Sequence, residues 1–242
     1  MVISLGHARR HEAFPSHTTT NHSCTRCPAL LGLAFCALLA SGCARDKAPE
    51  GESAAPPLAW KRLYEERDQH DEDAGNPVVV IATSMGDIEV ELFPGRAPIT
   101  VDNFLRYVSE EYYDGLVFHR VIPGFMVQAG AYTPELASKE PDGTIENEAT
   151  NGLSNLRGTV AMARRPEPHT ASAQFFINLV DNEYLDHRNK TNEGFGYCVF
   201  GGVVRGMDVV DRIAQVRTRR KGGMEDLPAT DIIIKSVRLK KR

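Results

Sequence analysis

The sequence predicts a mainly β domain, a closed eight-stranded antiparallel barrel capped by two α-helices. From residue 77 onward the chain contains about eight short runs rich in β-branched and aromatic residues, separated by turn-forming residues. Helical periodicity occurs in two segments, which is too few for repeated strand–helix–strand crossovers. Closure of an antiparallel sheet removes its exposed edges, and a helix across each open end covers the interior.

The first elements follow from local patterns. "VVVIAT" (78–83) and "IEVELF" (88–93) flank the turn "SMGD" and predict a β-hairpin. The second run alternates apolar residues with glutamates, which is typical of a half-buried strand. "APITVDNFLRYVSEEYY" (97–113) predicts a helix, because Pro98 suits a first turn and apolar residues recur on one face.

The later elements are shorter. Further strand candidates lie at 116–121, 125–130, 158–163, 174–179 and 197–204. A second helix is expected at 206–216, and a last strand at 230–240. Loops are expected at 131–157, 164–173, 186–196 and 217–230. Sites often form on long loops carried by a rigid sheet.

The N-terminal segment resembles an export signal. Residues 29–42, "ALLGLAFCALLASG", are apolar and uncharged, follow Arg26, and are shorter than the roughly 20 residues of a membrane span. "LLASGC" is similar to a bacterial lipobox, although Ala40 stands where Leu is usual. We therefore predict that residues 1–43 are a signal segment ending at Cys43, which is lipidated. The alternative is an ordinary secretory signal that leaves a soluble periplasmic protein.

A linker separates this segment from the body of the chain. Residues 44–76 are rich in Ala, Pro and charged residues, which predicts a flexible tether, and Asn76-Pro77 marks the boundary of a domain at 77–242. The formal net charge of −4 gives no basic excess of the kind that nucleic-acid binding requires.

The cysteines are concentrated at the N-terminus. Apart from Cys198 they all lie within the first 43 residues, so the body cannot be built on disulfides. Cys24 and Cys27, in a C-x-x-C pair near two histidines, are either a metal or redox site or an incidental pair in a removed segment. Cys198 alternates with Tyr197 and is expected to be a small buried hydrophobe.

Hydrolytic chemistry has little support in the body. Its histidines are His119, His169 and His187, and neither H-E-x-x-H nor G-x-S-x-G occurs. His119 lies within a strand candidate, which favours a structural imidazole over a catalytic one. Glu146 and Glu148 are either metal ligands or carboxylates that cap backbone or face water.

One stretch is unusual. "FHRVIPGFMVQAG" (118–130) places Arg120 among large apolar residues without an obvious nucleophile. Taken alone, an arginine in an amphipathic strand is most often solvated or an ion-pair partner.

Five strings resemble the cyclophilin family of peptidyl-prolyl isomerases: "FHRVIPGFMVQAG", "GTVAMAR", "SAQFFINL", "LDH" and "FGYCVFGGVVRGMDVVDRI". The resemblance covers nearly all of 78–240, in order and at family spacing, and it is greatest to the bacterial periplasmic branch. It implies a barrel with a substrate groove on its outside, proline-containing polypeptides as partners, a monomer, and neither cofactor nor metal.

The resemblance also implies the site. Arg120 matches the catalytic arginine, and Gln128 and Gln174 match groups that hydrogen-bond the peptide. The remaining matches are the proline pocket (Phe125, Met126, Phe176, Leu185) and a strand-like docking edge (Ala163, Arg164). Two positions on the groove depart from the animal and fungal pattern, with Tyr184 in place of tryptophan and Tyr197 in place of histidine. Neither departure puts activity in doubt, but the missing tryptophan puts in doubt tight binding of cyclosporin-class inhibitors, since it supplies part of their contact.

Strand alternation places Phe175 and Phe176 on opposite faces. We assign Phe176 to the groove by the family match, and Phe175, Phe118 and Phe200 to the barrel core. The expected function is isomerisation of X–Pro bonds in exported proteins, by an enzyme lipid-anchored in the bacterial cell envelope and facing the periplasm. The alternative is a proline-peptide binding or chaperone module with little turnover.

Overall fold

A computed structural model of the protein describes residues 75–241. The predicted signal segment, the tether, Cys43 and the Cys24–Cys27 pair therefore lie outside the described residues. Within the described part, no helix has both the length and the apolar character needed to cross a membrane.

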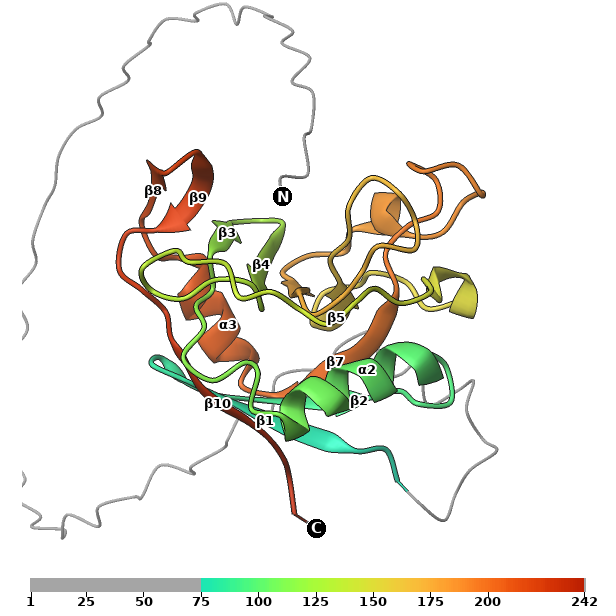
Figure 1. The fold of residues 1–242 in the computed structure, drawn as a ribbon, viewed down its shortest axis with the longest axis horizontal. Coiled ribbons are helices and arrows are strands. Elements are labelled where there is room, and N and C mark those ends of the chain that lie inside the picture. Colours follow the sequence, from blue (N-terminus) through green and yellow to red (C-terminus); the bar gives the residue numbers. More distant parts are fainter. Residues whose placement is uncertain (1–74, 242) are drawn as a thin grey trace, which may run out of the picture. The chain divides into compact units, whose positions relative to one another are not determined.

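The fold is one antiparallel eight-stranded sheet that curls around a core, with two helices (Figure 1). The strand order is β10-β1-β2-β7-β5-β6-β4-β3. The strands are β1 (Val78–Thr83), β2 (Gly86–Leu92), β3 (Arg120–Ile122), β4 (Met126–Ala129), β5 (Thr159–Met162), β6 (Phe175–Asn178), β7 (Val199–Arg205) and β10 (Ile234–Leu239). The helices are α2 (Pro98–Ser109) and α3 (Met207–Ala214), with short 3₁₀ turns η1 (Ala149–Asn151) and η2 (Glu183–Leu185). The predicted fold class is confirmed.

The barrel closes through the segments just before its two end strands. Val117 and Ile233 form a single antiparallel bridge, and the Phe118 N–H donates to the Ile232 carbonyl at 2.9 Å. Beside this seam, both carboxylate oxygens of Asp114 accept hydrogen bonds from the Arg238 guanidinium, at 2.9 and 2.6 Å. This pairing lowers the pKa of Asp114. Edge strands β3 and β10 are thus joined by a short clasp.

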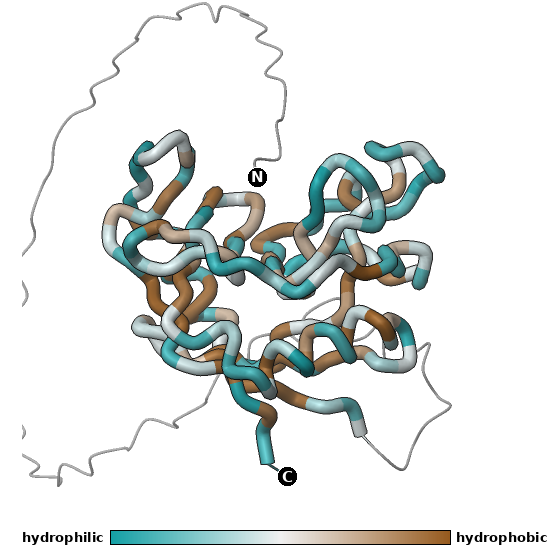
Figure 2. The backbone as a smooth tube through the Cα atoms, in the orientation of Figure 1, coloured by the Kyte–Doolittle hydropathy of each residue, from teal (hydrophilic) through white to brown (hydrophobic). Residues whose placement is uncertain are grey.

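The sheet buries apolar residues on both faces. One cluster fills the barrel under the helices and contains Phe118, Phe175 and Phe200, as predicted. Phe175 meets the ring of Phe104 from α2 edge-on, with centroids 5.7 Å apart. Phe176 belongs to a second, smaller cluster on the outer face. Figure 2 shows that hydrophobic residues are concentrated in the strands, while the residues of the long loops at the top of the view are largely hydrophilic.

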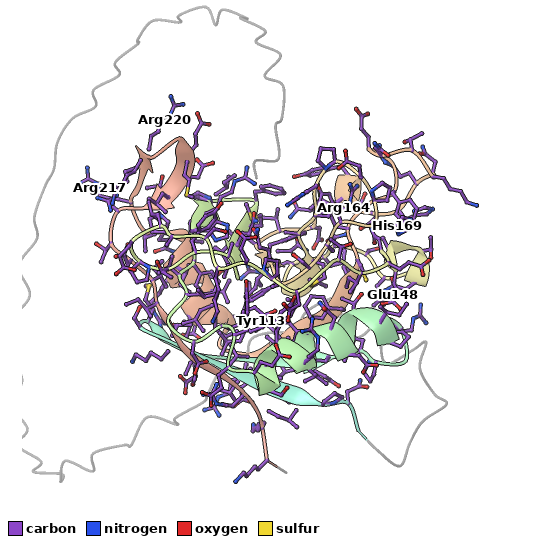
Figure 3. The ribbon with its side chains drawn as sticks, viewed as in Figure 1. Tyr113, Glu148, Arg164, His169, Arg217 and Arg220 are labelled. Carbon is purple, nitrogen blue, oxygen red and sulfur yellow. The ribbon has the colours of Figure 1, made fainter. Side chains whose placement is uncertain are left out.

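Two side chains resolve ambiguities in the sequence. Cys198 is buried in the inner cluster, as expected, and burial raises the pKa of its thiol to about 12. Glu148 caps α2 from the long loop: its carboxylate accepts hydrogen bonds from the Thr100 N–H at 2.8 Å and the Thr100 hydroxyl at 2.7 Å (Figure 3). Glu146 is exposed. The capping interpretation therefore holds for Glu148, and the cap fastens the loop to the helix.

The segment 217–230, expected to be a loop, contains a hairpin. β8 (Thr218–Lys221) and β9 (Met224–Pro228) form a separate two-stranded sheet. Gly222 and Gly223 form its turn, with φ of 59° and 79°, the positive values that two-residue hairpin turns require. The sequence expectation failed because "TRRK" is wholly polar and wholly exposed.

Replacing Glu148 should destabilise the fold. Glu148→Ala leaves the buried Thr100 hydroxyl and the first N–H groups of α2 without their acceptor, so we expect a loss of about 2 kcal/mol. Urea unfolding followed by circular dichroism measures this loss. Glu146→Ala removes an equal charge two residues away and should stay within about 0.5 kcal/mol of the wild type. Equal losses in the two variants would contradict the cap.

Candidate active site

A row of side chains crosses four strands on the outer face of the sheet. Arg120 in β3 lies directly opposite Gln128 in β4, Gln128 lies opposite Phe176 in β6, and Phe176 lies opposite Ala161 in β5. Directly opposite residues of antiparallel strands project to the same face of a sheet. The row therefore runs from a cation, through an amide, to an apolar surface.

Arg120 is held largely out of water. Its side chain is 12% exposed, and its Nη1 is buried without a hydrogen-bond partner among the described residues. Burial lowers the pKa of the guanidinium, and the nearby carboxylate of Asp226 opposes that shift. A guanidinium remains charged at neutral pH in spite of such a shift. Arg120 thus presents a desolvated cationic donor.

A cluster of apolar side chains, called the slot below, lies along the row. Phe125, Met126, Phe176 and Leu185 all belong to the outer cluster, and all four are buried. β4 and β6 supply Met126 and Phe176, the turn before β4 supplies Phe125, and η2 supplies Leu185. The residues predicted for the proline pocket therefore lie together.

Two tyrosines border the slot. Tyr184 stacks on Phe125 with ring centroids 5.9 Å apart, and it is 49% exposed. Tyr197 meets Phe176 edge-on at 5.7 Å. Burial raises the pKa of both hydroxyls, so both rings stay neutral at physiological pH. They form a rim that is apolar in body and polar at its tip.

The two glutamines predicted to bind the peptide form a hydrogen bond with each other. Gln128 Nε2 donates to Gln174 Oε1 at 2.9 Å, while Gln128 Oε1 is buried without a partner in the described residues. The row thus carries an unpaired donor on Arg120 and an unpaired acceptor on Gln128. A peptide group supplies the complement of both.

At the predicted docking edge, the backbone of Ala163 and the side chain of Arg164 make different contacts. Ala163 extends the pairing beyond β6, its N–H donating at 2.9 Å to the carbonyl of Gln174, the residue just before that strand. The Arg164 side chain instead fastens neighbouring loops, donating to the carbonyls of Pro166, Asn192 and Gly196 at 2.7, 2.8 and 2.9 Å (Figure 3). It also lies over the Tyr197 ring, 4.7 Å from its centroid. Its guanidinium is therefore occupied, and the edge consists of backbone.

A buried asparagine network that the sequence reading missed supports the slot. Asn182 Nδ2 donates to the Phe125 carbonyl at 3.0 Å and to Asn178 Oδ1 at 2.8 Å. Asn178 in turn donates to Thr159 Oγ1 at 2.8 Å. The two asparagines in "INLVDN" (177–182), at the end of a predicted strand, were the sequence signal that could have indicated this network. They fix the turn that carries Phe125.

A polar cavity of about 310 Å³ adjoins the slot. It shares Gln128, Ala163 and Arg164 with the groove, and loop residues such as Lys139, Thr144 and Thr170 complete it. Sequence reading expected a site on these loops but could not place their residues. The polar cavity thus borders the apolar cluster at Ala163.

Comparisons with known proteins agree with this geometry. The family model described as cyclophilin type peptidyl-prolyl cis-trans isomerase/CLD matches residues 78–239. Peptidyl-prolyl cis-trans isomerase B of Escherichia coli K12 is 51% identical over 160 residues, covering 66% of this chain and 98% of that protein. Peptidyl-prolyl cis-trans isomerase A of Dickeya dadantii is 47% identical over 164 residues, covering 68% and 85%.

Solved structures show the same fold. A crystal structure of a Cryptosporidium parvum cyclophilin type isomerase has a TM-score of 0.60 and 26% identity, covering 69% of this chain and 99% of that one. A second crystal structure of that protein, obtained in the presence of the dipeptide Ala-Pro, has a TM-score of 0.59 and 26% identity, covering 68% and 99%.

His119 should make stability, but not catalysis, depend on pH. Burial lowers its pKa to about 3 in the folded protein, against about 6.5 in an unfolded chain. The unfolded state therefore takes up a proton first as pH falls. The stability is complete above about pH 6.5 and declines toward pH 3, with a slope of up to about 1.4 kcal/mol per pH unit.

Urea unfolding at pH 7.5, 5.5 and 4.5 measures this decline. His119→Phe, which keeps an aromatic ring against Tyr132 at this site, should show a shallower decline than the wild type. Turnover of the folded wild type should have no inflection near pH 6.5. Parallel stability curves for the two proteins would contradict a neutral buried imidazole.

Proposed function

The chain belongs to the cyclophilin-type peptidyl-prolyl cis-trans isomerases and catalyses rotation about X–Pro bonds in proline-containing peptides, and from this premise we propose which side chains perform the reaction and which proteins it serves. The observation that carries the first proposal is the row Arg120–Gln128–Phe176 beside the apolar slot. Arg120 is the catalytic donor, and the slot holds the proline ring.

The barrier sets what these groups must supply. Amide resonance gives rotation a barrier of about 18–20 kcal/mol, so uncatalysed X–Pro exchange takes roughly tens to hundreds of seconds. Turnover in milliseconds requires a reduction of about 6–7 kcal/mol. No covalent bond is made or broken, so the site needs no nucleophile.

The twisted state differs from both planar states. When the bond leaves its plane, the nitrogen lone pair becomes localised and accepts a hydrogen bond, while the carbonyl oxygen carries less charge. Arg120 donates to that nitrogen in the twisted state alone, which is the differential binding that catalysis requires. One such donor in a dry site contributes about 3–4 kcal/mol.

The slot supplies the remainder. Phe125, Met126, Phe176 and Leu185 hold the pyrrolidine ring still while the preceding residue turns. Their apolar surface favours the twisted state, which is less polar than the planar amide. Gln128 and Gln174, with the backbone edge at Ala163 and Arg164, fix the peptide on both sides. Tyr184 and Tyr197 close the rim over it.

Arg120→Ala should reduce kcat/KM at least about 100-fold, because it removes the donor to the twisted nitrogen. A protease-coupled assay with a proline peptide measures turnover, and circular dichroism checks folding. Arg120→Lys should lose nearly as much, since lysine lacks the planar fork. Arg205→Ala, which removes a largely exposed arginine from β7, is the control and should retain wild-type turnover. Wild-type turnover in Arg120→Ala would reject the role of this residue.

We also propose that the enzyme acts on exported proteins from a lipid anchor in the bacterial cell envelope, facing the periplasm. The uncharged apolar run 29–42 followed by Cys43 supports this proposal. The tether 44–76 then gives the catalytic domain reach from the membrane. A monomer suffices, because the described domain supplies the whole row and slot itself.

Cys43→Ser should release the enzyme from the membrane fraction, because the acyl chains attach through its sulfur. Mass spectrometry of the wild-type chain should find Cys43 as a lipid-bearing N-terminus, which also removes the Cys24–Cys27 pair. Cys36→Ala, a change within the apolar run, is the control and should remain in the membrane fraction. A lipid-free mature chain would instead support the ordinary secretory signal.

A further inference from the structure

The β8–β9 hairpin places a carboxylate beside the catalytic arginine. Asp226 in β9 brings Oδ2 to 3.8 Å from Nε of Arg120. Its side chain is 39% exposed, whereas that of Arg120 is 12% exposed. The hairpin packs beside β3 (Figure 1). The partner of Arg120 therefore comes from a segment more than one hundred residues further along the chain.

The two sides of the guanidinium have different surroundings. Asp226 lies on the Nε side, at a distance that makes an ion pair rather than a hydrogen bond. Nη1 is buried and has no partner among the described residues. Gln128 lies directly opposite in β4, and its Nε2 donates a hydrogen bond to Gln174. One side of the fork thus faces a carboxylate of the protein, and Nη1 on the other side has no hydrogen-bond partner among the described residues.

The backbone of Asp226 has an unusual conformation. Its φ is 58°, a left-handed conformation that non-glycine residues seldom adopt and that costs of order 1 kcal/mol. The next residues, Leu227 and Pro228, are buried, and Thr218 pairs with Pro228 across the hairpin. Strained residues that persist beside a site are a reason to look for a role.

The other acid of the hairpin, Glu225, has a different ion-pair partner. Glu225 pairs with Arg220 on the outer side of the hairpin, and Figure 3 shows Arg217 and Arg220 directed away from the barrel. Burial of Arg120 disfavours its charge, and Asp226 is the largest opposing influence on its pKa. Glu225 acts on the pKa of Arg120 in the same direction but less strongly, and of the two acids in the hairpin Asp226 is the one that forms an ion pair with Arg120.

We propose that Asp226 is a positioning residue for the isomerase reaction, holding the Nε side of Arg120 so that its Nη atoms face the substrate nitrogen. This inference rests on the proposed role of Arg120. Asp226 does not touch the substrate, so its loss leaves peptide binding intact. A variant without Asp226 loses the alignment of the Arg120 donor with the nitrogen of the twisted bond. A displacement of about 1 Å at that point has large kinetic effects.

The test compares Asp226→Asn with Glu225→Gln in the full chain. Asp226→Asn keeps the shape of the side chain and tolerates a positive φ. It should lower kcat about 10-fold with KM within about twofold of the wild type. Glu225→Gln removes an equal charge one residue away and should leave both constants within about twofold. The ¹H–¹⁵N signal of Arg120 Nε should shift in Asp226→Asn and stay in place in Glu225→Gln.

A second variant separates alignment from folding. Asp226→Gly relieves the left-handed strain, so it should keep or raise the unfolding midpoint while showing the same loss of kcat. Wild-type kcat in both Asp226 variants, or an equal loss in Glu225→Gln, would overturn the inference. So would a rise in KM that accounts for the whole loss. Arg120→Ala measured in parallel distinguishes the failures: if it alone is inactive, the role of Arg120 stands and that of Asp226 falls.

Discussion

A guanidinium kept almost out of water beside an apolar slot is the constraint on which the outer face of this protein depends. Burying an unpaired charge costs several kcal/mol, so Arg120 needs a carboxylate nearby, and Asp226 provides it from another sheet. The same burial strengthens any hydrogen bond that the guanidinium makes. The groove therefore combines a cation and apolar side chains because each makes the other effective.

The sheet divides stability and chemistry between its two faces. β4, β5 and β6 are buried along their whole length, because the barrel core covers one face and the groove cluster lies on the other. β2, away from the groove, buries alternate residues. Adjacent residues such as Phe175 and Phe176 thus serve different ends, the first in the core and the second in the slot.

Much of this arrangement could be predicted from the sequence, and the failures have physical causes. Alternation separates Phe175 from Phe176, and turn residues delimit the strands of the barrel. The β8 strand was not predicted, because its residues are all exposed and polar, although Gly222-Gly223 was a usable signal for the hairpin turn. Arg164 and Asp226 depend on contacts between distant segments, and no local pattern specifies those.

The pairing of β1 with β10 has a consequence for biosynthesis. The first strand of the domain finds one of its two neighbours in the last one, and the clasp at Ile233 joins the barrel just ahead of that strand. A chain that emerges N-terminus first cannot complete this sheet until β10 has been synthesised. Such long-range pairing slows folding and leaves an open strand edge during elongation. The domain that speeds isomerisation in other polypeptides therefore completes its own fold only after its last strand has been made.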